Sequence, residues 1–480
     1  MERLKKVGSV RIKSAKEISY SRLSLGFEKL DRNVFDPEKA YDKVAAIGVK
    51  WIRLQSGWAR TEKEKGIYDF AWLDCIVDNI INRGMNPWLC LCYGNALYTR
   101  TAENVFGAVG HAPVYTEEER LGWVNYVKAI VSRYKGKIEY YEVWNEPDWL
   151  WQDENGNKIV PHSNAVEYAK FASLTADAVH SIDDKAKVVG GAISRLYDFS
   201  YINEALATGL AEKIDAISIH GYVADDTLRS GYLKMFRALL DSYRPGIELI
   251  QGESGAQSRS DGAGALKGFS WNEEKQMKYL LRGLLHDLAS DVKFTSYFST
   301  LDMIEGLRGL LSDKKSYLDY GYFGVLRADF DENGFATGEY SPKKSYKALQ
   351  VIATLFSEDC KPCSILARYV SIPSKRVNGN DCDDRTIVMH TFEKDNGSKA
   401  IVYWNAVPLL TQTYEGTLSF QTFGLDSDVK LIDLADGTVY EIPEEMKKDM
   451  GYGEIQLLNL PISDTPKALV FGNFIDGIDD

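Results

Sequence analysis

Two glutamates of this 480-residue chain occupy positions where a pair of carboxyl groups could act together. Glu146 lies near the end of EYYEVWNEPD at residues 139–148, and Glu253 ends IELIQGE at residues 247–253. A proline follows the first glutamate, and a serine and a glycine follow the second, so the chain must turn after each. Two facing carboxyl groups can break a glycosidic bond: one protonates the leaving oxygen, and the other attacks as a nucleophile at about 5 Å or activates water when farther away.

The residues before both glutamates have the character of strands. Residues 138–145 alternate with the two-residue period of a pleated strand. An arbitrary glutamate is usually a solvated surface charge. A glutamate that ends an apolar strand and precedes turn-forming residues instead indicates the carboxyl end of a barrel strand, where barrel enzymes keep their catalytic residues.

Short apolar runs alternate with amphipathic helical stretches from about residue 23, which is the pattern of βα units around a parallel sheet. The eighth helix is expected at residues 343–356, after a long insertion that starts near residue 301. Eight such units predict an α/β fold, the (β/α)8 TIM barrel, and a doubly wound sheet is the less favoured alternative. Strands are predicted at residues 23–27, 51–55, 87–92, 138–145, 188–192, 216–220, 249–253 and 294–298.

The helical period stops after residue 356. Short alternating runs separated by Asn-Gly and Asp-Gly turns predict a small antiparallel β-sandwich. Residues 9–18 also alternate and are expected to add a strand to it. The predicted organisation is therefore a catalytic barrel at residues 20–356 and a sandwich formed by residues 1–19 and 357–480.

Composition narrows the range of partners. The chain is 45% hydrophobic and 26% charged, and its net charge of −12 argues against binding to nucleic acid or to an anionic membrane. No apolar run approaches the length of a membrane span, and the basic N-terminus lacks the apolar stretch of a signal peptide. A cytoplasmic protein and a secreted one whose leader has been removed both remain open, as does a homo-oligomer.

Metal-ligand residues are few. Cys360 and Cys363 form a C-x-x-C that, together with Cys382, could bind a metal or cross-link, but three sulfurs without a nearby histidine are a weak zinc signal. Reduced loop cysteines are the favoured interpretation. Of the six histidines, His220 alone is well placed at a strand end, so no metal or other cofactor is predicted.

Two motifs resemble those of a known group of enzymes. The W-N-E-P of residues 144–147 and the G-E-S of residues 252–254 are similar to those of clan A retaining glycoside hydrolases, and the spacing and the C-terminal sandwich most resemble glycoside hydrolase family 39, which is β-xylosidase-like. The resemblance implies that Glu146 is the general acid/base and Glu253 the nucleophile. It also implies that Asn145 hydrogen-bonds the 2-hydroxyl of the sugar.

The resemblance assigns roles to three further residues. Arg53 matches an arginine near the nucleophile and would hold Glu253 ionised, with a structural ion pair to Glu142 as the alternative. His220 and Tyr222, in I-H-G-Y, match a position where an aromatic hydroxyl touches the nucleophile. Tyr222 is favoured for this contact, and a packing role for His220 is equally open.

Loops are expected to complete the cleft. Trp149 and Trp151 would overhang it and stack on a leaving-group sugar, although either could equally be a core residue. Glu28, in the first βα loop with a lysine, an aspartate and an arginine nearby, could hydrogen-bond sugar hydroxyls or be solvated. His111 lies in the long loop of residues 93–115, which is expected to shape specificity.

The predicted eighth strand departs from the family pattern. Related enzymes present a tryptophan there as the floor of the innermost sugar site, whereas this chain has TSYFS at residues 295–299. Tyr297 or Phe298 is expected to substitute, or Trp271 from the preceding loop. Asp302, in the insertion that follows, is a further candidate for shaping the site.

These observations predict a retaining glycosidase that works by double displacement through a covalent glycosyl-enzyme intermediate, exo-acting on a β-xyloside-like glycoside. An arabinoside or galactoside could use the same two carboxylates. An endo-acting glycanase of the same clan would need an open cleft, whereas the long loops favour a pocket. A non-catalytic carbohydrate-binding barrel would lack one of the two carboxylates, and a metal-dependent hydrolase would need a His/Asp cluster at strand ends.

Overall fold

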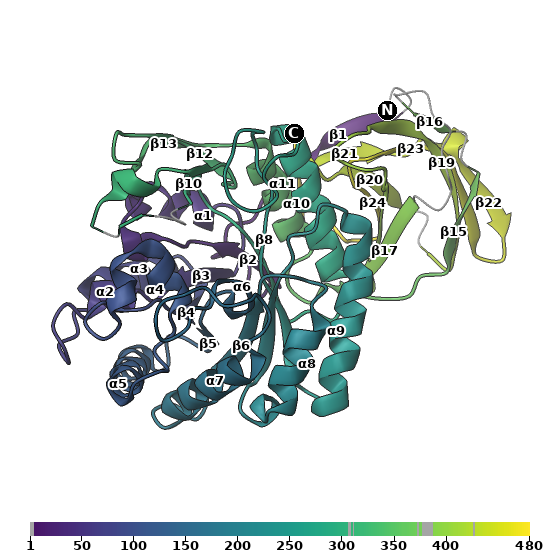
Figure 1. Ribbon diagram of the computed structural model, residues 1–480. Coiled ribbons are helices and arrows are strands. Elements are labelled where there is room, and N and C mark those ends of the chain that lie inside the picture. Colours follow the sequence, from purple (N-terminus) through teal and green to yellow (C-terminus); the bar gives the residue numbers. More distant parts are fainter. Residues whose placement is uncertain (1–3, 306–308, 311, 372–373, 377–386, 426–427) are drawn as a thin grey trace.

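The computed structural model describes all residues except 1–3, 306–308, 311, 372–373, 377–386 and 426–427. Figure 1 shows a helix-wrapped barrel beside a smaller body of antiparallel strands. Strands β2 to β9 follow one another around a closed barrel, and each neighbouring pair is parallel, including β2 with β9. The predicted (β/α)8 barrel is confirmed, because every predicted strand overlaps one of β2 (Leu23–Gly26), β3 (Trp51–Gln55), β4 (Asn86–Leu91), β5 (Tyr140–Val143), β6 (Lys187–Ile193), β7 (Ala216–His220), β8 (Glu248–Ser254) and β9 (Thr295–Tyr297).

Helices surround the barrel (Figure 1), and several of them begin at a residue whose side chain caps the first turn. In α5 (Glu117–Tyr134), Thr116 and Glu119 form a reciprocal capping box. The first helix after β2 is short: a 3-10 turn at Pro37–Lys39 precedes α1 (Tyr41–Ala45). The other helices that follow barrel strands are α3 (Ala71–Asn82), α7 (Ala165–His180), α8 (Phe199–Ala207), α9 (Arg229–Tyr243), α10 (Glu273–Leu288) and α11 (Lys344–Leu355); three short ones, α2 (Trp58–Thr61), α4 (Val105–Gly110) and α6 (Pro147–Leu150), lie in loops.

The barrel interior changes from apolar to polar along the strands. Residues within the first three positions of the strands, or directly before them, form one buried cluster, which fills the bottom of the barrel: Trp51, Trp88, Tyr140, Val189, Ala216, Ile250 and Phe294. Farther along β3, the guanidinium of Arg53 lies 5.6 Å above the ring of Trp88. The carboxyl ends of the strands therefore hold the charged groups above a packed apolar base, as in other barrels of this kind.

The C-terminal region holds two antiparallel sheets. The first has the order β14-β17-β18-β24-β20-β21-β1-β25, and the second has the order β15-β19-β23-β22, with β16 also paired to β19. Their strands are β14 (Lys361–Pro362), β15 (Ala367–Ser371), β16 (Ser374–Arg376), β17 (Ile387–Glu393), β18 (Lys399–Asn405), β19 (Tyr414–Phe423), β20 (Val429–Asp433), β21 (Thr438–Glu441), β22 (Lys447–Gly451), β23 (Glu454–Ser463), β24 (Lys467–Phe471) and β25 (Ile478–Asp479). A second buried core, with Tyr403, Leu418 and Leu460 among its members, lies between them.

The N-terminal strand runs beside these C-terminal strands (Figure 1). It is β1 (Lys5–Val10), which pairs with β21 and β25. The sequence placed this strand at residues 9–18, so its position was several residues too late. The buried guanidinium of Arg282 in α10 donates to the backbone carbonyls of Asn405 and Asp464, and these hydrogen bonds join the barrel to the C-terminal sheets.

The insertion after β9 forms two antiparallel pairs, β10 (Met303–Ile304) with β11 (Tyr320–Gly321) and β12 (Leu326–Phe330) with β13 (Ala336–Pro342).

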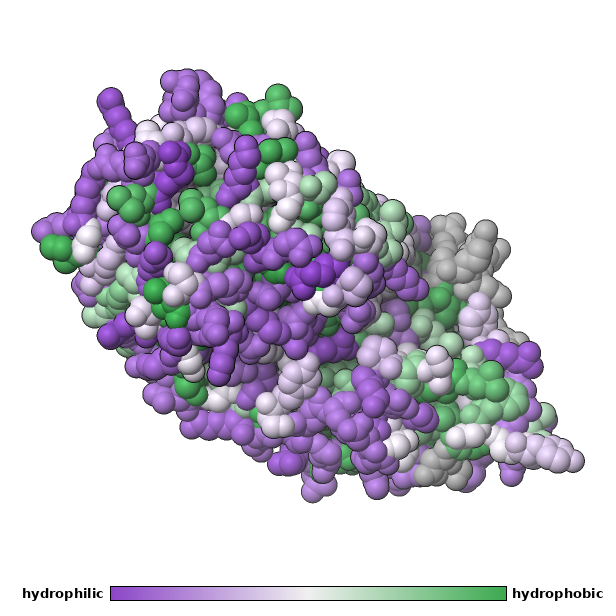
Figure 2. Space-filling model, turned by 90° about the horizontal axis from the view of Figure 1, so that it is seen from below, coloured by the Kyte–Doolittle hydropathy of each residue, from purple (hydrophilic) through white to green (hydrophobic). Residues whose placement is uncertain are grey.

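Among the described residues, no helix has the length and apolar character needed to cross a bilayer. Hydrophilic side chains cover most of the face in Figure 2, and the hydrophobic areas there are small and separate.

Candidate active site

Glu146 lies just beyond the end of β5, where the backbone turns sharply. Trp144 and Glu146 both adopt positive φ angles, of 67° and 48°. Pro147 follows as the first residue of α6, a position that suits its fixed φ and its missing N–H. β5 ends at Val143, and the chain turns at Glu146, directly before the proline, as the sequence predicted.

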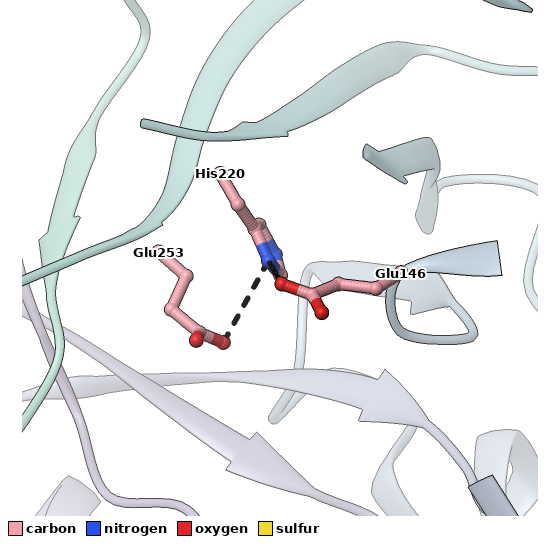
Figure 3. Close-up of side chains that lie close together, drawn as sticks. All are labelled: Glu146, His220 and Glu253. Atoms are coloured by element: carbon pink, nitrogen blue, oxygen red, sulfur yellow. Dashed lines mark hydrogen bonds and ion pairs between the residues drawn. The ribbon is translucent and has the colours of Figure 1, made fainter. Parts of the chain in front are cut away.

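The two glutamates meet at the top of the barrel with an imidazole between them (Figure 3). His220, the last residue of β7, places Nδ1 2.8 Å from Oε1 of Glu146 and 3.9 Å from Oε2 of Glu253. One atom from each of the three residues lies within 4.8 Å of the others. The carboxylates keep limited access to solvent, since their side chains are 20% and 13% exposed. The structure therefore brings the predicted pair together at one rim of the barrel.

Charges around Glu253 determine its protonation. Burial alone would raise its pKa, but His220, Arg53 and the hydroxyl of Tyr222 outweigh burial, so the pKa of Glu253 lies below its usual range. Burial likewise acts to lower the pKa of His220, but the negative charges of Glu253 and Glu146 raise it above the ordinary value. Glu253 is therefore ionised at neutral pH, as a nucleophile must be.

Arg53 links four groups of the site. Its Nη1 lies 3.0 Å from Glu253 Oε2, its Nη2 donates to Glu142 at 2.6 Å, and it also donates to Asn145 Oδ1 at 2.8 Å. Glu28 completes the set at 3.3 Å. Both alternatives raised for Arg53 describe the same side chain: it touches the expected nucleophile and it also forms a buried ion pair with Glu142.

Tyr222 and Asn145 flank the pair. The Tyr222 hydroxyl donates to Glu253 Oε1 at 2.7 Å, on the oxygen that Arg53 does not bind. The hydrogen bond from Arg53 holds the side-chain carbonyl of Asn145, and this leaves the side-chain NH2 of Asn145 available to a ligand. The nucleophile is thus held at both oxygens.

Glu28 and Lys29, expected at a solvated or sugar-facing loop, are buried. Glu28 is 1% exposed, and burial, partly offset by Arg53 and reinforced by Glu253, raises its pKa to about 7. Lys29 lies 3.4 Å from Glu305 and donates to the Ile304 carbonyl at 2.8 Å. Sequence reasoning missed Glu305, because it lies in an insertion without any periodic pattern.

Tyr297, Phe298 and Trp271 were the candidates for the floor of the sugar site, and Phe298 is the one that lies next to the charge of Lys29. Phe298 faces Lys29, whose Nζ lies 5.4 Å from its ring centroid. Tyr297 points the other way and is 2% exposed in the barrel's outer core, and Trp271 packs against Tyr279. Tyr297 therefore does not line the site as expected, because neighbouring residues of a strand face opposite sides.

The two tryptophans predicted for the cleft, Trp149 and Trp151, differ in their exposure to solvent. Trp149 is 37% exposed, and the cations of Lys158 and Arg195 lie 4.5 and 5.0 Å from its ring. Trp151 is instead 1% exposed and donates to Glu167 at 2.8 Å, so it is the core residue of the two tryptophans.

His111 and Asp302 also lie away from the pair. His111 is 3% exposed and contacts Thr101 at 3.0 Å, so it braces its own loop rather than facing the cleft. Asp302 forms a buried ion pair of 2.6 Å with Lys343, which holds the insertion against α11. Neither expected role in the cleft matches these positions.

Glu146, His220 and Glu253 also form the one group of described side chains close enough to ligate a metal ion. The Arg53 guanidinium at 3.0 Å from Glu253 already supplies positive charge there and opposes a second cation. In the part of the chain that the structure describes, Cys360 and Cys363 are free thiols. Cys382, the third sulfur considered, lies outside the described residues.

Comparisons with known proteins find similarity to glycoside hydrolases. Residues 33–244 match the model of Glycosyl hydrolases family 39, a region that includes Glu146, His220 and Tyr222 but ends before Glu253. A beta-xylosidase from Geobacillus stearothermophilus is 26% identical over 171 residues, which cover 33% of this chain and 32% of that protein. The match thus spans about a third of the length of this curated relative.

Solved structures share the fold. A family 39 glycoside hydrolase from Bacteroides cellulosilyticus WH2 superposes with a TM-score of 0.63 at 18% identity, covering 94% of this chain and 81% of that one. A family 39 β-xylosidase from Caulobacter crescentus gives 0.56 at 16% identity, with 97% of both chains covered. A family 30 endoxylanase from Clostridium papyrosolvens gives 0.55 at 12%, covering 97% and 98%. Over residues 33–244 this chain is therefore similar to glycosyl hydrolases of family 39, and it shares their closed parallel barrel.

Proposed function

We propose that the protein is a retaining, exo-acting glycoside hydrolase for β-xyloside-like substrates, with Glu146 as acid/base and Glu253 as nucleophile. The observation that carries this proposal is the separation of their carboxylate oxygens, within 4.8 Å. Retaining enzymes hold the two carboxyl groups about 5–5.5 Å apart, and inverting enzymes need about 6.5–9.5 Å to admit water.

The reaction has two displacements. In the first, Glu253 attacks the anomeric carbon while Glu146 gives its proton to the leaving oxygen, which forms a glycosyl ester. In the second, Glu146 takes a proton from water, and that water displaces Glu253. Each displacement inverts the anomeric carbon, so the product keeps the configuration of the substrate.

The surrounding residues supply orientation and charge. Arg53 and Tyr222 hold both oxygens of Glu253 and favour its ionised form. His220, at 2.8 Å from Glu146, positions the acid/base. The amide of Asn145 would bind the sugar 2-hydroxyl, a contact that strengthens as positive charge develops on the ring.

The proposed substrate and mode of action are supported by a relative's name and by the residues around Glu253. The curated relative is named a beta-xylosidase, which favours a xyloside. The Lys29–Glu305 ion pair and Phe298 stand close to the expected nucleophile and favour an enclosed pocket, and so exo action, over an open cleft. An endo-acting glycanase of the same clan is the second candidate, since the same two carboxylates would serve it.

A panel of nitrophenyl glycosides tests the activity and the sugar, with proton NMR of the first product to read its anomeric configuration. We expect the β-xyloside to be the best substrate and the first-formed sugar to be the β-anomer. An α-anomer as first product would overturn the retaining mechanism. Xylohexaose then separates the two modes: single xylose units at early times indicate exo action, and mixed oligomers indicate endo action.

A further inference from the structure

A cavity of about 250 Å³ lies among the loops at the carboxyl ends of the barrel strands, and none of the residues that carry the mechanism above lines it. It opens between the loops that follow β2, β3 and β4, with α4 as its outer wall. Its volume is below that of a drug-sized site, so its occupant is a small group such as one ring. The lining residues are Asp31, Arg32, Gly57, Trp58, Ala59, Arg60, Tyr93, Gly94, Val105, Ala108 and Val109.

The inner wall of this cavity is tied to the site through Gln55. The Gln55 carbonyl accepts from the backbone N–H of Lys29 at 2.9 Å and from Arg32 at 3.2 Å, and its amide donates to the Tyr93 hydroxyl at 3.1 Å. Gln55 lies two residues after Arg53 on β3, so both side chains point to the same side of the strand. The cavity therefore begins one side chain away from the arginine that holds Glu253.

A polar group in the cavity wall lacks a hydrogen-bond donor. The side chain of Asp31 is 9% exposed, and its Oδ1 accepts no hydrogen bond from any described residue. The guanidinium of Arg32 is 3.6 Å from Oδ1, too far for a hydrogen bond. Gly57 permits this placement, because a Cβ there would come within 2.7 Å of the Asp31 Cβ. A buried carboxylate oxygen without a donor is costly, so a ligand that donates a hydrogen bond would be favoured here.

The other lining residues indicate which kind of ligand would donate a hydrogen bond to Asp31. Arg32 lies over the Tyr93 ring at 5.8 Å and presents N–H groups beside the carboxylate, while Val105, Ala108 and Val109 form an apolar side. Arg60 is engaged with the Trp72 ring at 4.3 Å and with the Leu30 carbonyl, so the cavity does not offer the paired cations that a phosphate needs. A carboxylate next to a guanidinium, facing an apolar wall, matches neighbouring hydroxyls on a ring whose C–H groups are apolar.

We propose that this cavity is a subsite for a second, neutral sugar residue of the substrate, with Asp31 accepting hydrogen bonds from its hydroxyls and Arg32 donating to them. The proposal rests on the glycosidase activity proposed above. It makes the enzyme selective for oligosaccharides over simple aryl glycosides.

The test compares Asp31→Asn with wild type on nitrophenyl β-xyloside and on xylobiose and xylotriose. We expect kcat/KM to fall more than 10-fold on the best oligosaccharide, mainly through KM, and less than 3-fold on the aryl glycoside. Ala108→Phe fills the cavity without changing its charge and should show the same selective loss. Asp42→Asn, an exposed carboxylate of α1, is the matched control and should leave both substrates unchanged.

Binding gives an independent readout. Titration of Glu253→Gln with xylotriose should give a Kd that rises at least 10-fold when Asp31→Asn is added. Equal losses on aryl and oligosaccharide substrates, or an unchanged Kd, would overturn the subsite while the glycosidase proposal stands. Failure of the wild type to cleave any aryl glycoside or oligosaccharide would instead remove the proposed function.

Discussion

Arg53 of β3 and Glu253 of β8 meet across the mouth of the barrel, with 3.0 Å between Nη1 and Oε2. The same guanidinium binds Glu142 and the Asn145 carbonyl, so one side chain fixes the expected nucleophile and the residue next to the expected acid/base. Because Arg53 is fully buried, these contacts are not screened by water. The position of Glu253 is therefore coupled through Arg53 to that of Asn145, which precedes Glu146.

Arg53→Lys should lower kcat/KM by at least 100-fold. A single ammonium cannot reproduce the fork that reaches Glu253, Glu142 and Asn145 together. With less positive charge beside it, Glu253 should titrate at higher pH, so the acidic limb of the pH–rate profile should move upward. Arg133→Lys, an exposed pair to Asp74, is the control and should leave the profile unchanged. An unshifted acidic limb in Arg53→Lys would contradict the role given to this arginine.

Glu253→Ala should abolish turnover while the protein stays folded. Azide is small enough to enter the space left by the carboxylate and attack the anomeric carbon, so it should restore measurable activity on an aryl glycoside and give an α-glycosyl azide. Mass and NMR analysis of the azide adduct reads the outcome. Glu248→Gln, at the opposite end of the same strand, should keep its activity. Full activity in Glu253→Ala would assign the nucleophile to another residue.

Glu146→Ala should separate substrates by their leaving groups. Dinitrophenolate leaves without a proton, so cleavage of its xyloside should fall about 10-fold or less in the first step, whereas xylobiose cleavage should fall by 10³-fold or more. Pre-steady-state release of dinitrophenol measures the first step alone. Azide should accelerate turnover and give a β-glycosyl azide, because it replaces water in the second step. Similar losses on both substrates would count against an acid role.

Local pattern was enough to predict the barrel and the glutamate pair. Short apolar runs between helical stretches located each barrel strand, and Pro147 predicted the turn at Glu146. Strand ends of a parallel barrel meet at one rim, so Glu146 and Glu253 could be expected to face each other before any coordinates were known.

Features that depend on distant contacts could not be predicted in this way. Lys29 and Glu305 come from opposite ends of the barrel sequence, and no spacing rule joins them. Tyr297 and Phe298 are equal candidates by residue type, and a shift of one residue along the strand decides which of them faces the site. Trp151 is buried because Glu167 in α7 receives its indole N–H, a contact that depends on how the loop after β5 folds back on that helix.

Glu28→Gln should change how stability depends on pH. The pKa of Glu28 is raised to about 7 by burial and by the nearby Glu253, so between its ordinary value of 4.5 and pH 7 the native state holds a proton that the unfolded chain has released. Stability from this group is therefore complete below about pH 4.5 and is lost as pH rises through 7, by about 1–3 kcal/mol in total. Glutamine keeps the shape of the protonated acid but cannot ionise.

Melting temperatures measured from pH 5 to 8 should fall less steeply in Glu28→Gln than in wild type, so the variant gains relative stability at pH 8. The lowered pKa of Glu253 acts in the opposite direction, with stability lost as pH falls, but it is present in both proteins and cancels in the comparison. Glu118→Gln, an exposed glutamate of α5, should follow the wild-type curve. Parallel curves for Glu28→Gln and wild type would show that Glu28 is already ionised in the folded protein at pH 5.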